Sequence, residues 1–267
     1  MTAITDGEFA QFQRFIYEAA GITLARTKKS LVAGRLSRRL QHCGVASYAE
    51  YLKLLTSGAA AAELQTAVDL LTTNETYFFR EPKHFEFLRQ ELAKPRRRAV
   101  QYRAWSAAGS TGEEAYSIAM VLEDCLPGQP WEVLASDIST RVLARARAGH
   151  YSLQRTSHVP PAYLKRFCLK GQGAQHGTLL VERWLRSKVR FLHVNLNARL
   201  PQLGTFDVVF LRNVLIYFDA ETKRKVVERI ANAIKPGGLL LIGHSETLTG
   251  IYDALETVSP SIYRKGE

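Results

Sequence analysis

The sequence predicts an α/β fold that follows an all-helical N-terminal domain. Residues 6–71 repeat apolar side chains at helical spacing, which is typical of amphipathic helices. From about residue 100 onward, strand-like apolar runs alternate with helical segments, as in folds built on a parallel sheet. The run FDVVFL at 206–211 is almost continuously apolar, which suits a strand at the centre of such a sheet.

The division predicted is a helical domain at 1–71 and an α/β domain at 72–267. In the helical domain, the first amphipathic stripe is expected to end at Gly21, because glycine accepts the left-handed conformation that ends many helices. A second helix is expected over about 28–43, and two further helices complete the domain.

The second helix also carries a basic arc beside its apolar stripe. Its members are Lys28, Arg35, Arg38, Arg39 and His42. A solvated face is the ordinary explanation of such a run. The alternative is a docking surface, either for nucleic acid or for an acidic protein. Because nucleic-acid readers interleave aromatic or base-reading side chains and this arc has none, the pattern favours an acidic protein partner.

A strand, a small-residue turn and a helix open the α/β domain. The strand is expected over Val100–Trp105 and the helix over Glu113–Asp124, with Gly109 and Gly112 between them. This arrangement places backbone N–H groups against a nucleotide-like ligand. Two acids at the helix start would repel a pyrophosphate, so a ligand with hydroxyls and a positive charge fits better. An ordinary turn without a ligand is the alternative.

The remaining elements continue the alternation with one interruption. A strand over 131–136 ends at Asp137, where an acid can accept hydrogen bonds from ribose hydroxyls. Residues 149–188 break the pattern and indicate an inserted small β element. The other predicted segments are a helix at 139–148, strands at 189–194 and 206–211, a helix at 221–234 stopped by Lys235–Gly238, and strands at 239–243 and 257–264.

Composition limits the partners and the compartment. The formal net charge of +11 over 267 residues indicates an acidic partner. The three cysteines are scattered and form no Cys-x-x-Cys pair, which favours a reducing compartment. No signal peptide or membrane-spanning run is apparent. We therefore expect a cytoplasmic protein without membrane insertion, and we predict no metal site.

Several motifs occur together in a fixed order. They are LTTNETYFFR at 71–80, WSAAGSTGEEAYS at 105–117, ASDI at 135–138, RNVLIYFD at 212–219, KPGG at 235–238 and GHSE at 243–246. Together they resemble the chemotaxis receptor methyltransferases, the CheR family, along almost the whole chain. The resemblance implies a Rossmann-like class I methyltransferase sheet dependent on S-adenosyl-L-methionine (SAM). It also implies an N-terminal all-helical domain and a small inserted antiparallel β subdomain, here at about 166–186.

The activity implied is glutamate O-methylation. The enzyme would transfer a methyl group from SAM to glutamates in the cytoplasmic helical domain of chemoreceptors, releasing S-adenosyl-L-homocysteine (SAH). In some relatives the β subdomain grips a receptor's C-terminal peptide, a question that these residues leave open. The alternatives are a nucleic-acid methyltransferase and a non-catalytic receptor adaptor. An Asn-Pro-Pro-Tyr type motif would suit the nucleic-acid enzyme, but Arg212-Asn-Val-Leu stands in that place, and nucleic acid is not an expected partner.

The resemblance also implies which residues form the site. The expected cofactor contacts are Asn74, Thr76, Arg80, Glu114, Asp137, Asn195, Leu196, Arg212 and Asn213. Arg80 is expected to orient the substrate carboxylate, and Tyr217 to donate a hydrogen bond near the transferred methyl group. A packed aromatic side chain is the alternative for Tyr217. The expected docking residues for the acidic receptor helix are Lys28, Arg35, Arg38 and Arg39.

Overall fold

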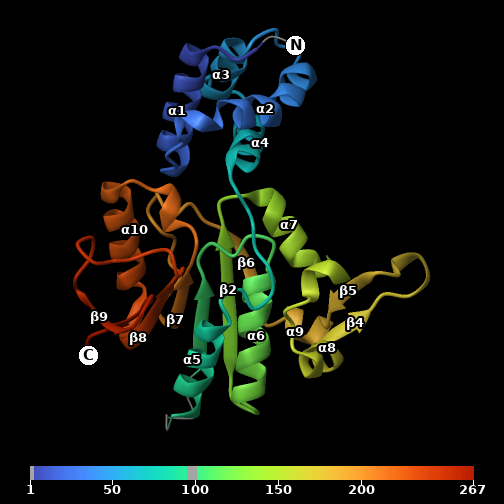
Figure 1. Ribbon diagram of the computed structural model, residues 1–267, viewed down its shortest axis with the longest axis vertical. Helices are drawn as coiled ribbons and strands as arrows, with labels where there is room; N and C mark the ends of the chain where they lie inside the picture. Colours follow the sequence, from blue (N-terminus) through green and yellow to red (C-terminus); the bar gives the residue numbers. More distant parts are fainter. Residues whose placement is uncertain (1–2, 95–100) are drawn as a thin grey trace.

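The computed structural model of the protein describes residues 3–94 and 101–267. A helical head, residues 6–71, stands on one end of an α/β body, and a small second sheet lies beside that body (Figure 1). Val100, the first residue of the first predicted strand, lies outside the described residues.

The head consists of the predicted helices. Their bounds are α1 Asp6–Ala20, α2 Lys29–Cys43, α3 Tyr48–Thr56 and α4 Ala61–Leu71. Thr5 and Glu8 form a capping box at the start of α1, and the left-handed Gly21, with φ of 73°, ends it. A 3-10 turn precedes α2, so Lys28 lies at the N-cap of that helix instead of within it.

The main sheet has the strand order β6-β2-β1-β7-β8-β10-β9. The first five strands in this order run parallel, whereas β10 pairs antiparallel with β8 and with β9. The order reverses between β1 and β7, and ligands of open α/β sheets bind beside such a reversal. The bounds are β1 Tyr102–Ser106, β2 Trp131–Asp137, β6 Val189–His193, β7 Phe206–Leu211, β8 Ile234–Ile242, β9 Leu255–Ser259 and β10 Ile262–Lys265.

Helices cover both faces of this sheet (Figure 1). On one face, α5 (Pro82–Ala93) and α6 (Glu113–Cys125) pack against alternate side chains of the central strands. On that same face α7 (Thr140–Ala148) packs beside α6 and against β2 and β6, and Tyr116 Oη donates to the Ala146 carbonyl at 2.8 Å. On the other face lies α10 (Ala220–Asn232). Successive side chains of β7 point to opposite faces of the sheet, and helices cover both faces. FDVVFL is therefore apolar at nearly every position.

The apolar core of the head continues into the body. Phe12 and Leu36 of the head belong to the same buried cluster as Trp105 of β1 and Val226 of α10. Each of these four side chains is fully buried. Because burial of apolar area is the main stabilising term in folding, this shared core fixes the head on the body.

The second sheet is antiparallel, with the order β3-β5-β4. Its bounds are β3 His150–Ser152, β4 Cys168–Lys170 and β5 Thr178–Val181, with α8 (Pro161–Phe167) before β4 and α9 (Arg183–Arg186) after β5. The sheet extends beyond the predicted range 166–186, because β3 pairs with β5 through His150 and Leu180. A three-residue strand carries too few side chains for periodicity to reveal it.

Two predicted boundaries near the C-terminus are wrong. Lys235–Gly238 does not lie between a helix and a strand, because β8 already begins at Ile234 and an irregular register accommodates the glycines. The predicted strand 257–264 is two strands, separated by a turn in which Ser261 has a φ of 61°. No helix within 3–94 or 101–267 is long and apolar enough to cross a membrane.

Candidate active site

A cavity of about 300 Å³ lies between the head and the carboxyl ends of the parallel strands. Every cofactor contact expected from the sequence lines it, as do Tyr217, Lys28 and Arg35. The side chains come from the junction after α4, the turn after β1, and the ends of β2, β6 and β7. The fold therefore assembles residues that lie far apart in the sequence at one ligand-sized site.

The glycine-rich turn after β1 is held against β2. Gly109 N donates to the Ser136 carbonyl at 2.8 Å, and Ser110 N donates to Asp137 Oδ2 at 2.9 Å. A Cβ atom at Gly109 would lie 2.9 Å from Ser106 Oγ, so a larger residue would push the turn outward. The turn thus keeps its backbone close to the cavity wall.

Asp137 is buried at the end of β2 but keeps lone pairs for a ligand. Its Oδ1 atom accepts from Ser139 N at 2.9 Å, in addition to the bond from Ser110. Burial raises the pKa of Asp137, and these two backbone donors oppose the shift. A carboxylate oxygen accepts more than one hydrogen bond, so Asp137 can also receive ligand hydroxyls.

Asp69 braces this corner from the head, a role that we did not predict. The buried Asp69 carboxylate accepts from Thr140 N at 2.9 Å, from Arg141 N at 3.1 Å and from Thr140 Oγ1 at 2.8 Å. A carboxylate at the start of α7 satisfies its free N–H groups and favours the helix dipole. An acid inside the apolar run AVDLL was the available signal.

Arg212 is buried between two carboxylates below the cavity. Its Nη2 atom lies 3.1 Å from Glu81 Oε2, and its Nη1 atom lies 3.2 Å from Glu114 Oε2. Burial raises the pKa of Glu114, and Arg212 opposes this only in part. For Glu81, burial is outweighed by Arg212 and by hydrogen bonds from Asn213 and His244, so its pKa is lowered. Glu81 was not among the predicted site residues.

Two donor atoms of Arg212 remain available to a ligand. Nε and Nη1 are buried and have no hydrogen-bond partner among the described residues, although Nη1 is within ion-pair distance of Glu114. Buried donors without an acceptor are costly, so a ligand that supplies one is favoured. A ligand with an acidic group and ribose-like hydroxyls would satisfy both Arg212 and Asp137.

Other expected contacts are partly occupied by the protein itself. Asn195 Nδ2 donates to the Ala19 carbonyl at 2.7 Å, which ties the head to the body. Asn213 has a φ of 56°, and its backbone N–H donates to Glu246 Oε2 at 2.9 Å. The Asn74 carbonyl accepts from Ser110 Oγ at 2.9 Å. These residues shape the wall, and their direct contact with a cofactor stays a prediction.

The two catalytic candidates both line the cavity. Arg80 Nη1 donates to the Glu75 carbonyl at 3.0 Å, and the guanidinium lies 5.7 Å from the centre of the Tyr77 ring. Tyr217 is half-buried, and its carbonyl accepts from Thr23 N at 2.8 Å, so the head fixes its backbone. Arg80 is thereby held at the junction, and Tyr217 is held in the 3-10 turn Leu215–Tyr217 that follows β7.

The basic arc divides into residues with different roles. Lys28 is exposed at the cavity rim and Arg38 is exposed on α2. Arg35 also lines the cavity, and it donates to the Thr72 carbonyl at 3.0 Å. Arg39 instead forms an ion pair with Glu63 inside the head, with Nε 2.9 Å from Oε1. Its position on the arc turns it toward α4, so it is not a free docking cation.

Two family models match this chain. The CheR methyltransferase all-alpha domain matches residues 7–72, and the CheR methyltransferase SAM binding domain matches residues 74–263. The chemotaxis protein methyltransferase of Escherichia coli is 43% identical over 92% of this chain and 86% of its own length. That of Salmonella typhimurium is 41% identical over 98% of this chain and 91% of its own.

A further relative and one solved structure extend the comparison. Chemotaxis protein methyltransferase 2 of Pseudomonas aeruginosa is 40% identical over 97% of this chain and 93% of its own. The N-methyltransferase NodS from Bradyrhizobium japonicum, solved with SAH, covers 74% of this chain and 95% of its own, with a TM-score of 0.42 and 17% identity. Both CheR models match in order and together span nearly all residues, so the chain belongs to the CheR methyltransferase family.

Proposed function

We propose that the protein is a SAM-dependent methyltransferase that converts glutamate side chains of chemoreceptors to methyl esters. The observation that carries the proposal is the cavity at the sheet edge. Its wall combines a buried carboxylate that can accept hydroxyls with buried guanidinium donors, and its rim is the basic head. The same cavity is lined by all cofactor contacts that the family resemblance implies.

The residues present fit SAM. Asp137 would accept hydrogen bonds from the ribose hydroxyls, and the free donors of Arg212 would face the carboxylate of the methionine moiety. Glu114 would lie near the amino and sulfonium groups, where its negative charge is favourable. When bound, SAM supplies an electrophilic methyl group on a positively charged sulfur.

The protein residues then need only to position the nucleophile. A glutamate carboxylate is already ionised near neutral pH, because its ordinary pKa is about 4.3. No general base is therefore required, and catalysis can rest on orientation and exclusion of water. Arg80 would orient the substrate carboxylate through its planar guanidinium, and Tyr217 would donate a hydrogen bond beside the reacting atoms.

The substrate would approach along the head. Lys28 and Arg35 present positive charge at the cavity, and Arg38 is exposed further along α2; together they complement an acidic helix of a receptor's cytoplasmic domain. A receptor's C-terminal peptide could add a strand to the second sheet, where Leu169 on the edge strand β4 is 49% exposed. Docking at two places would raise the effective concentration of the glutamate at the cavity.

The test is transfer of a labelled methyl group. The protein is incubated with SAM carrying a radioactive methyl group and with receptor fragments, and the labelled fragments are treated with base. Label released as methanol identifies a glutamyl ester, whereas label that resists base identifies methylation at nitrogen. A fragment in which the acceptor glutamates are replaced by glutamine is the matched control. Absence of label in folded receptor fragments would refute the proposal.

A further inference from the structure

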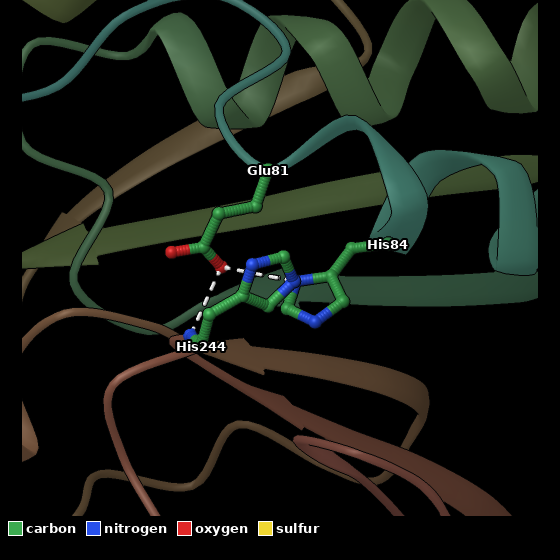
Figure 2. Close-up of side chains that lie close together, drawn as sticks. All are labelled: Glu81, His84 and His244. Carbon is green, nitrogen blue, oxygen red and sulfur yellow. Dashed lines mark hydrogen bonds and ion pairs between the residues drawn. The ribbon is translucent and has the colours of Figure 1, made fainter.

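Three potential metal ligands meet beside the cofactor cavity, on the side of Arg212 away from Glu114. They are Glu81 at the N-cap of α5, His84 in the first turn of α5, and His244 after β8 (Figure 2). Glu81 Oε2 lies 3.4 Å from His84 Nδ1 and 3.9 Å from His244 Nε2. One ligand atom from each residue lies within 4.8 Å of the other two.

Ser261 Oγ lies within hydrogen-bond distance of two groups, the Pro260 carbonyl at 2.6 Å and His84 Nε2 at 2.8 Å. When the hydroxyl donates to the carbonyl, Nε2 is the donor in the bond between His84 and Ser261. In that tautomer the other ring nitrogen, Nδ1, carries a lone pair.

That lone pair has no hydrogen-bond partner in the described chain. His84 is 1% exposed, and its Nδ1 atom is buried without a donor, facing the Glu81 carboxylate. With the proton on Nε2, Nδ1 and the Glu81 carboxylate are two acceptors with no hydrogen between them. Glu81 Oε2 already accepts from His244 N at 3.3 Å and pairs with Arg212, so the ring nitrogen is the atom that lacks a partner. A bound cation would supply one.

We propose that Glu81, His84 and His244 bind a divalent transition-metal ion such as Zn²⁺. Two imidazoles and one carboxylate, with remaining positions open to water, are a ligand set that zinc accepts. Tetrahedral bonds of about 2.0 Å separate ligand atoms by about 3.3 Å. The 3.4 Å between Glu81 Oε2 and His84 Nδ1 already matches this geometry. The His244 side chain is 46% exposed, so it has room to shorten the 3.9 Å between its Nε2 atom and Glu81 Oε2.

The surroundings supply the other features of a metal site. Ser261 orients His84, and Asn213 Nδ2 donates to Glu81 Oε1 at 3.2 Å, so two of the three ligands are held by hydrogen bonds. His84, His244 and Ser261 also line a shallow surface pocket, which gives the ion a route from solvent. We predicted no metal site from the sequence, because His244 is far from the other two ligands along the chain.

The ion would be linked to the cofactor cavity through a shared atom. Glu81 Oε2 is the oxygen proposed to bind the ion, and it is also the oxygen 3.1 Å from Arg212 Nη2. Metal binding would therefore draw Glu81 away from Arg212 and change the charge that the guanidinium presents to the cavity. This link goes beyond the proposed methyl transfer, which needs no metal ion.

The experiment uses the full-length protein after treatment with a chelator. Zinc binding is measured by calorimetry, and the visible spectrum of the Co²⁺ form reports the ligands. We expect one ion per chain and a cobalt spectrum without thiolate charge-transfer bands. His244→Ala should weaken zinc binding roughly tenfold or more, because one of three ligands is lost. His176→Ala removes an exposed histidine from the loop of the second sheet and should leave affinity unchanged.

Three outcomes would overturn the proposal. They are no stoichiometric binding, equal affinity in His244→Ala, or thiolate bands that place the ion on Cys43, Cys125 or Cys168. His244 is half-exposed, so its replacement should not unfold the chain, and a thermal melt checks this. SAH binding is measured on the same sample. SAH uptake without zinc refutes only the metal site, and zinc uptake without SAH refutes only the cofactor site.

Discussion

Replacing Asp69 tests whether the head holds the cofactor site in shape. In Asp69→Ala, two backbone N–H groups and one hydroxyl at the start of α7 lose their acceptor. A hydrogen bond to a charged group contributes about 1.5–3 kcal/mol. Thr140 and Arg141 are exposed, so water replaces part of the loss, and we expect a cost of about 3 kcal/mol.

For a chain of 267 residues, that cost corresponds to a fall in melting temperature of about 6–12 °C. Urea unfolding followed by circular dichroism measures the free energy of unfolding. Asp69→Asn keeps the shape and one acceptor, so it should lose about half as much. Asp6→Ala is the control, because its side chain is 96% exposed and its ion pair with Lys29 lies in solvent, where such pairs add little to stability.

The same substitution should weaken SAH binding several-fold. Ser139, which donates to Asp137, directly precedes the helix that Asp69 caps, so loosening that helix loosens the ribose-accepting carboxylate. Calorimetry with SAH measures the dissociation constant. If Asp69→Ala changed stability no more than Asp6→Ala and left SAH affinity intact, the reasoning that the head braces the site would be wrong.

Three further predictions concern the site itself. Burial raises the pKa of Asp137, so as the pH falls this residue takes up a proton earlier than an exposed aspartate does. The protonated residue accepts fewer hydrogen bonds from a ligand, so SAH binding measured by titration calorimetry should weaken in the acid range. Asp137→Asn should bind weakly with a flat pH profile. Arg80→Ala should lower receptor methylation roughly 100-fold in a filter assay, and unchanged turnover would remove its proposed role. Combined Lys28→Ala and Arg38→Ala should raise the KM for receptor about fivefold at low salt, whereas Arg190→Ala, exposed on β6, should not.

The stability effect of Asp137 has the opposite sign to its effect on binding. A raised pKa means that the folded state binds the proton more tightly than the unfolded chain does. Protonation of Asp137 therefore adds to the free energy of unfolding in full below the pKa that this residue has in the unfolded chain. This contribution is lost as the pH rises through the pKa that Asp137 has in the folded protein. In the acid range, the protein without ligand should gain from protonation of this residue while SAH binding declines.

Local patterns were sufficient to predict the elements that carry the cavity. The turn around Gly109 and the acid at Asp137 follow strands, and strand ends of a parallel sheet meet at one edge, so their convergence is set by the fold class. The apolar run at 206–211 likewise has one consistent place, at the centre of the sheet. In these segments the nearest neighbours along the chain decide the structure.

Contacts between distant segments could not be predicted in this way. Asp69 meets Thr140 only because the head is packed on the body, and no periodicity encodes that packing. Arg39 carries the same charge as the other arc residues, but it forms an ion pair with Glu63 on a neighbouring helix. Proline and glycine at 235–238 predict the end of the preceding helix, yet β8 runs through them because an irregular register accommodates them.

The apolar core shared by α1, α2, β1 and α10 has a consequence for substrate choice. Since apolar side chains of the head and the body pack directly against one another there, the span from the arginine-bearing helix to the point of methyl transfer is fixed by that packing. The enzyme cannot adjust its reach to a glutamate that lies too near or too far. Which glutamate is methylated then depends on the position along the receptor helix at which that helix binds the head.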